Sequence, residues 1–225
     1  APLRLRARAI AEGLYAGEHR SARRGPGVEF FGQRPYVPGD DLRFFDKRSL
    51  LRHGKLMIRE FETETDRSLW IVVDATTSMT FRGSGPGAKL AYAALIAAAM
   101  ARVAVATGDP VGLGFIGGEN ARLVPARAGG EAFERVVGAL EALRGGGDLA
   151  NDPRALDRAI GPVAERARRG STIVFLSDLI DLPPQAEAAI GALATRGRTV
   201  VVGQILDPDE ETLPYEGHSR FRSLE

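Results

Sequence analysis

The chain has 225 residues, of which 44% are hydrophobic and 26% are charged, a composition that suits one large folded domain or a domain with an appendage. The absence of cysteine excludes disulfides, thiol catalysis and thiolate metal sites. A formal net charge of +1 gives no overall attraction to nucleic acid or to an anionic membrane.

The first predicted element is a short helix over residues 4–22, which Gly25-Pro26-Gly27 ends. Arginines are frequent in this stretch and acidic residues are few, so it carries a local excess of positive charge. A solvated helix face is the usual cause of such a pattern, and a nucleic-acid-binding arm is the weaker alternative. We therefore expect no nucleic-acid partner.

Residues 28–67 are rich in glycine, proline, aspartate and arginine, with aromatic residues between them, and predict loops and short strands. The best strand is expected at residues 56–62. Pro38-Gly39-Asp40-Asp41 is a strong turn signal, and a second metal site built from these acids and Asp46 is the weaker interpretation. We expect residues 1–67 to form a helix and an extended segment that pack on a main domain of residues 68–225.

Predicted strands and helices alternate from residue 68 onward. Strands are expected at residues 69–74, 111–116, 121–124, 172–177 and 199–206, and helices at 89–107, 130–144, 153–169 and 184–196. This order predicts an α/β domain with a mostly parallel sheet and helices on both faces. The hairpin-type loop at residues 117–120 predicts one antiparallel edge strand.

No segment is expected to span a membrane, because the longest apolar candidate, residues 90–106, is rich in alanine and contains Arg102. The start of the chain also lacks the basic-then-apolar pattern of a signal peptide. We therefore expect a cytoplasmic protein with no membrane partner.

The most informative stretch is residues 69–79, in which an apolar run ends at Asp74 and is followed by Thr76 and Ser78 at alternate positions. Such a run is typical of a central parallel strand, so Asp74 is expected at the carboxyl end, where open α/β sheets bind ligands. A second apolar run, residues 172–176, stops at Ser177 and Asp178. Carboxylates, hydroxyls and water are ligands for a hard cation such as Mg²⁺. The simpler alternative for Asp74 is a carboxylate that caps the following turn.

The paired pattern, Asp-x-Thr-x-Ser after one strand and Ser-Asp after a later one, resembles the metal-ion-dependent adhesion site of von Willebrand factor A domains. From about residue 25 to its end, the chain resembles the bacterial domain of unknown function 58 (DUF58) family. The segments that carry this resemblance are residues 29–30, 36–43, 46, 52–56, 61–64, 108–113, 176–179 and 207–214. The resemblance implies a von Willebrand factor A-like, Rossmann-like sheet with one antiparallel edge strand, preceded by an extension of loops and short strands.

Two positions depart from the family pattern. Lys47 stands where the family usually has tryptophan, and Gly147 stands where it tends to have the threonine that supplies a metal-site hydroxyl. The missing oxygen must come from water, from Asp148 or from a partner. The resemblance thus implies a metal site formed by Asp74, Thr76, Ser78, Asp178 and Asp148.

We expect this site to bind Mg²⁺ weakly, with a free energy near −4 kcal/mol, or to be metal-free. In the absence of the cation, Asp74 and Asp178 would face each other as like charges. One of the two carboxylates is then expected to have a raised pKa or to recruit an arginine or lysine.

Two classes of function fit these features. The resemblance implies a non-enzymatic adaptor in which an acidic side chain of a partner protein binds the metal, and a MoxR-type AAA+ ATPase as partner in protein assembly, maturation or chaperone work. The alternative is a metal-assisted phosphatase or nucleotide-binding enzyme. Residues 83–89 form a glycine-rich stretch before a helix, but they lack the spacing of a phosphate-binding loop and predict a flexible connection. The histidines are scattered, so we predict no catalytic residue.

Overall fold

The computed structural model describes residues 2–15, 29–37, 45–62, 67–149, 152, 154–180, 182–195 and 197–218. The chain divides into two compact units: unit 1 consists of Ala1–His19 and Asp66–Glu225, and unit 2 consists of Arg20–Thr65. The sequence analysis grouped the first helix with the extended segment. In the structure this helix belongs to unit 1.

Unit 2 contains an antiparallel pair of strands, β1 (Glu29–Pro35) and β2 (Met57–Glu62), and the helix α2 (Lys47–His53). Strand β2 confirms the strand expected at residues 56–62. Helix α2 was not predicted, because its seven residues lie in a segment dense in loop-forming residue types.

The ends of α2 carry the usual helix signals. The Asp46 carboxylate accepts a hydrogen bond of 3.1 Å from the Arg48 amide, and Gly54 ends the helix at a φ of 63°. Asp46 also accepts from the Ser49 hydroxyl at 2.9 Å. These contacts give Asp46 a structural role as a helix cap, whereas the predicted turn at residues 38–41 lies outside the described residues.

Unit 1 is built on a five-stranded sheet with the order β5-β4-β3-β6-β7. Its strands are β3 (Leu69–Asp74), β4 (Val111–Ile116), β5 (Val124–Arg127), β6 (Thr172–Ser177) and β7 (Thr199–Gln204). All neighbours are parallel except β4 and β5, which confirms the mostly parallel sheet with one antiparallel edge strand.

Strand β5 begins three residues later than the predicted 121–124. Glu119 instead forms an isolated bridge with Arg144, with backbone hydrogen bonds of 2.8 and 3.2 Å. This bridge draws the connection after β4 toward the end of helix α4 (Gly130–Ala142), so the β4–β5 hairpin closes farther along the chain.

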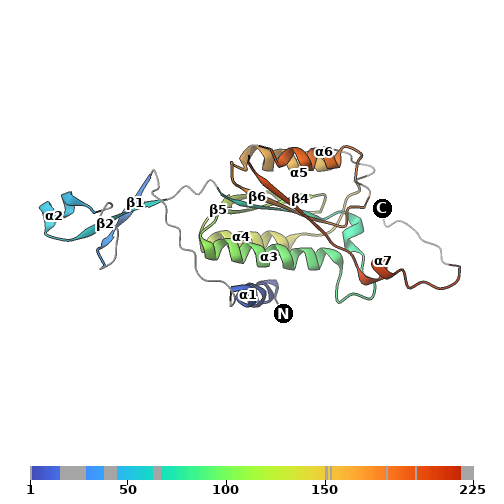
Figure 1. The fold of residues 1–225 in the computed structure, drawn as a ribbon. Helices are drawn as coiled ribbons and strands as arrows, with labels where there is room; N and C mark the ends of the chain where they lie inside the picture. The colour runs from blue at the N-terminus through green and yellow to red at the C-terminus, as the bar shows by residue number, and fades with distance from the viewer. Residues whose placement is uncertain are drawn as a thin grey trace. The chain divides into compact units, whose positions relative to one another are not determined.

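Helices cover both faces of the sheet (Figure 1). Helices α1 (Leu3–Tyr15), α3 (Lys89–Thr107) and α4 lie on one face, and α5 (Ala155–Arg166) and α6 (Ala186–Leu193) lie on the other. The predicted helices at 89–107, 130–144, 153–169 and 184–196 are therefore confirmed, three of them shorter than expected. The remaining elements are a 3₁₀ turn, η2 (Thr77–Thr80), and a short helix, α7 (Pro208–Thr212).

Helix α3 is the longest described helix of unit 1, with 19 residues. Its small buried side chains, among them Ala97, Ala98 and Ala101, let it lie close to the sheet. Among the described residues it is also the one helix that is long and apolar enough to cross a membrane, by length and composition alone. Because α3 contacts α1, α4 and β3, its composition is explained by its place in the core.

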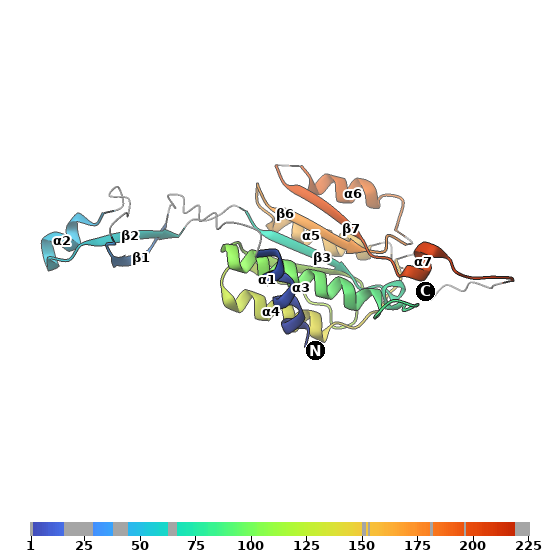
Figure 2. The same ribbon diagram turned by 60° about the horizontal axis from the view of Figure 1, so that its bottom comes forward.

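The topology brings the ends of β3 and β6 to one point (Figure 2). From β3 the chain continues through α3 to β4 on one side, and from β6 it continues through α6 to β7 on the other. Such a reversal between two adjacent parallel strands opens a crevice at their carboxyl ends, where α/β proteins bind ligands. Asp74 ends β3, and Asp178 follows β6 directly.

Candidate metal centre

Asp74 is fully buried at the end of β3 and accepts three hydrogen bonds. Its Oδ1 accepts from the Thr76 amide at 3.0 Å and from the Thr76 hydroxyl at 2.7 Å, and its Oδ2 accepts from the Ser177 hydroxyl at 2.6 Å. The bond to the Thr76 amide is the turn cap of the simpler interpretation. The bonds from the Thr76 and Ser177 hydroxyls are not part of that cap. They bring side chains from the ends of both β3 and β6 onto one carboxylate.

Three oxygens from the β3 end form a compact set. The Thr76 hydroxyl lies 2.7 Å from Asp74 Oδ1 and 3.2 Å from the Ser78 hydroxyl. Neighbouring ligands of an octahedral Mg²⁺, each about 2.1 Å from the ion, lie roughly 3 Å apart. The distances between these oxygens are hydrogen-bond lengths, and they are also compatible with neighbouring ligands of Mg²⁺. No three His, Asp or Glu side chains in the described part of the chain gather as a metal cluster, so hydroxyls must contribute to any such site.

Asp178 holds a buried lysine. Its side chain is 0% exposed, and its Oδ2 accepts a hydrogen bond of 2.8 Å from the ammonium of Lys89, whose side chain is 2% exposed. The same ammonium donates to Glu210 Oε1 at 2.6 Å. The expectation that one of the strand-end carboxylates recruits an arginine or lysine is thus confirmed.

Burial raises the pKa of Asp74 above its ordinary value, and the negative charge of Asp178 adds to the shift, while the hydrogen bonds from Ser177 and Thr76 oppose it. The ammonium of Lys89 neutralises only part of the negative charge of the surrounding carboxylates. When Asp74 is ionised, Asp74, Asp178 and Glu210 against one ammonium leave two negative charges. One divalent cation would neutralise them.

The loop of residues 145–148 lies against the turn that follows β3, as expected. The Gly147 carbonyl accepts from the amide and the hydroxyl of Thr77 at 2.9 and 3.0 Å, and the Gly146 amide donates to Ala75 at 2.8 Å. Gly147 has a φ of 92°, a conformation that side chains rarely adopt, so a threonine here would be strained. Asp148 follows it and is half-buried.

The stretch of residues 83–89 is held in place by the segment after β7, which corrects the predicted flexible connection. The Gly83 amide donates to Asp207 at 3.1 Å, and the Ser84 amide donates to Asp209 at 2.9 Å. The sequence did not indicate Lys89 and Glu210 as parts of this centre, and it indicated Ser177 only as part of the Ser-Asp pattern and not as a site residue. Only Ser177 carried a signal, because it ends the same apolar run that leads to Asp178.

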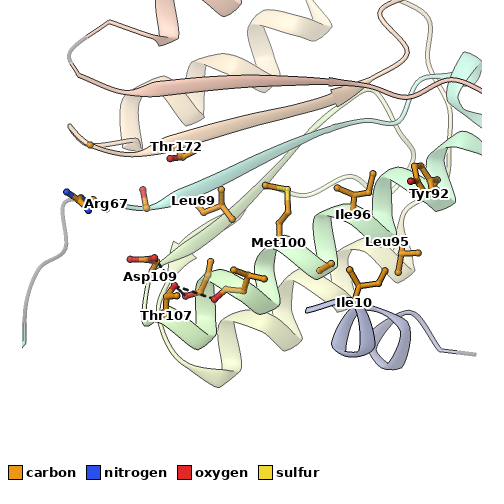
Figure 3. A pocket seen from close by; sticks show the side chains of 15 residues that line it. Ile10, Arg67, Leu69, Tyr92, Leu95, Ile96, Met100, Thr107, Asp109 and Thr172 are labelled. Carbon is orange, nitrogen blue, oxygen red and sulfur yellow. Dashed lines mark hydrogen bonds between the residues drawn. The ribbon is translucent and has the colours of Figure 1, made fainter. Parts of the chain in front are cut away.

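A separate cavity of about 610 Å³ lies along α3 (Figure 3). Ile10 of α1, Ile96 and Met100 of α3, and the strand starts Leu69 and Thr172 line it. The starts of β3 and β6 lie at the opposite edge of the sheet from Asp74 and Asp178. None of the predicted site residues lines this cavity, so it is not part of the candidate centre.

A family model described as "Protein of unknown function DUF58" matches residues 32–225. The chain belongs to the DUF58 family. Uncharacterized proteins of Mycobacterium tuberculosis and Mycobacterium bovis are each 30% identical to it over 215 residues, which is 92% of this chain and 63% of theirs. The DUF58 chain therefore spans less than two thirds of the length of these relatives.

Two solved structures are similar to part of this chain. One is a conserved hypothetical protein BatB from Bacteroides thetaiotaomicron, with a TM-score of 0.47, 19% identity, and coverage of 60% of this chain and 65% of that one. The other is an aerotolerance-related membrane protein from Bacteroides fragilis, with a TM-score of 0.49, 20% identity, and coverage of 70% and 76%.

Proposed function

We propose that unit 1 is a von Willebrand factor A-like, non-enzymatic binding module whose strand-end cluster is a metal-ion-dependent adhesion site. The observation that carries the proposal is the convergence of Asp74, Thr76 and Ser78 with Ser177 and Asp178 at the crevice between β3 and β6. The hydroxyl spacing, and the two negative charges that remain when Asp74 is ionised, support a Mg²⁺ ion as the resident group. The sheet order and the single antiparallel edge support the finer fold assignment.

Each residue has a distinct part in this proposal. Asp74, Thr76 and Ser78 would hold the ion, and Asp178 would supply the second carboxylate once Lys89 is shared or displaced. When bound, the ion supplies an open coordination position that an acidic side chain of a partner can fill. Ser177 fixes the rotamer of Asp74 through its 2.6 Å hydrogen bond, so it is a positioning residue. Asp148 or water would complete the ligand set beside Gly147.

The proposed partner is a MoxR-type AAA+ ATPase, in a cytoplasmic system for protein assembly or maturation. Its support is the resemblance to the DUF58 family, to which the chain belongs. The partner would bind at the carboxyl edge of the sheet, because loops at this edge surround the cluster and loops on rigid scaffolds carry recognition.

A pull-down tests the proposal with a MoxR-type ATPase from the same genome, in the presence of Mg²⁺ or EDTA. The informative variant is Asp74→Asn with Asp178→Asn, because each amide keeps the shape of the acid and still accepts hydrogen bonds at its one oxygen, but carries no charge. Asp157→Asn is the matched control, since Asp157 is an exposed acid on α5. Binding that needs Mg²⁺ and both acids supports the adhesion site. Equal binding by the folded double variant would remove it, and hydrolysis of a generic phosphate ester would favour an enzyme.

A further inference from the structure

The segment after β7 folds back onto the loop that precedes α3. Three successive acids of this segment contact residues 83–89: Asp207 accepts from the Gly83 amide at 3.1 Å, Asp209 from the Ser84 amide at 2.9 Å, and Glu210 from Lys89 at 2.6 Å. Asp209 also accepts from the Ser84 hydroxyl. Residues 83–89 are thus a receptor for carboxylates, occupied by the chain's own acids.

The receptor loop is shaped for this close approach. A Cβ at Gly85 would lie 2.6 Å from Asp207 Oδ2, so a side chain there would collide with the bound carboxylate. Gly83 is crowded by Asp207 and Asp209 in the same way. The backbone amides of the loop can reach the acids because these two positions lack side chains.

Apart from these contacts, helix α7 is held by its own capping box, in which Asp207 accepts from the Asp209 amide and Glu210 accepts from the Asp207 amide. It has five residues, and none of them is buried. The two apolar residues that follow are also exposed, Leu213 by 61% and Tyr215 by 45%. A helix this short does not persist by itself in water, so its position depends on the carboxylate contacts. These contacts are polar and are exposed or partly buried, so equivalent carboxylates can replace them.

We infer that α7 is an autoinhibitory latch, an internal acidic ligand that an acidic segment of a partner protein replaces. This inference rests on the proposed function of the same edge of unit 1. Lys89 couples the two sites, because its ammonium is shared between Glu210 of the latch and Asp178 of the metal cluster. The recognised partner segment presents carboxylates at the spacing of Asp207, Asp209 and Glu210. Its binding displaces α7 from residues 83–89.

Hydrogen–deuterium exchange of the full chain tests the latch directly. The variant is Asp209→Asn with Glu210→Gln, and Glu211→Gln is the matched control, since Glu211 is an exposed acid on the same helix. We expect the amides of residues 83–85, 207 and 209–213 to exchange at least tenfold faster in the double variant, with β3 and β6 unchanged. The control should behave as wild type. Equal exchange in wild type and double variant would overturn the latch.

Exchange for a ligand in trans is tested by adding a peptide of residues 205–214 to the double variant. The peptide should restore the protection of residues 83–85 against exchange. A peptide with Asn or Gln in place of Asp207, Asp209 and Glu210 should not. Absence of protection at millimolar peptide would overturn the exchange of ligands. Neither measurement needs a metal. If residues 83–85 exchange as expected in a protein that binds no Mg²⁺, the latch is supported while the proposed metal site fails, so the two proposals can be distinguished.

Discussion

Replacement of Lys89 by methionine should change the charge balance of the candidate centre more than other single substitutions. The Lys89 side chain is 2% exposed, and its ammonium pairs with Asp178, whose side chain is 0% exposed. Methionine fills similar space but leaves the Asp178 carboxylate buried without its cation. Removal of one partner of a buried ion pair costs about 3–5 kcal/mol of unfolding free energy. For a domain of 150–250 residues this corresponds to a Tm lower by roughly 6–20 °C.

Urea unfolding measures this loss, with and without Mg²⁺ at matched ionic strength. If the cation replaces the lost ammonium, Mg²⁺ at about ten times its Kd should restore roughly 1.4 kcal/mol to the variant. Wild type should gain less, since Lys89 already pairs with Asp178. Lys89→Met with Asp178→Asn should be less destabilised than the single variants predict together, because the two residues share one interaction.

Arg102→Met is the matched control, a cation on the same helix that lies 5.8 Å from the ring of Phe133. Its loss should cost about 1 kcal/mol and should not respond to Mg²⁺. The reasoning is refuted if Lys89→Met is as stable as wild type, or if Mg²⁺ stabilises both proteins equally.

Three further predictions follow from the same contacts. The pKa of Asp74 is raised in the folded state, so ionised Asp74 lowers the stability of the fold at neutral pH. Below the ordinary pKa of 3.8 the carboxyl is protonated in both states, and this penalty is absent. Asp74→Asn should therefore raise the Tm in EDTA at pH near 7 and not at pH near 3, as thermal melts at the two pH values will show. Burial opposes ionisation of Asp207, but hydrogen bonds from Asp209, Gly83 and Gly85 and the charge of Lys89 outweigh it and lower the pKa of Asp207. The stability that ionised Asp207 contributes is present above pH 3.8 and is lost as the pH falls through the lower pKa of the folded state. Asp207→Asn should therefore make the fall in stability at acid pH less steep. An unchanged fall in stability would contradict this prediction. Gly147→Thr should lower the unfolding free energy by about 1–3 kcal/mol because of its φ of 92°, and a calorimetric Mg²⁺ titration will show whether the added hydroxyl strengthens metal binding despite that strain.

The parts of the fold that could be predicted are those written in local patterns. The ends of β3, β4 and β6 follow from apolar runs with sharp polar limits, and Asp74 and Asp178 were brought together by the rule that parallel strands end at the same edge. Helix α2 was missed although Asp46 and Gly54 mark its ends, because the surrounding residue types favour loops.

The charge pairing of the centre could not be read from the sequence. Lys89 is separated by 89 residues from Asp178 and by 121 from Glu210, and no periodicity links them. The sequence predicted that one of the two carboxylates has a raised pKa or recruits an arginine or lysine, but not which residue supplies the cation. The shift of β5 has a similar cause, because the bridge between Glu119 and Arg144 is a long-range contact.

The most direct test of the account is an NMR titration of the full chain with Mg²⁺, followed through backbone amide shifts. The account predicts weak saturable binding, near −4 kcal/mol, with the largest shifts at residues 74–78 and 177–179 and none of this response in Asp74→Asn. Shifts confined to the exposed acids of α7, or a response that persists in Asp74→Asn, would contradict the strand-end cluster as a metal site.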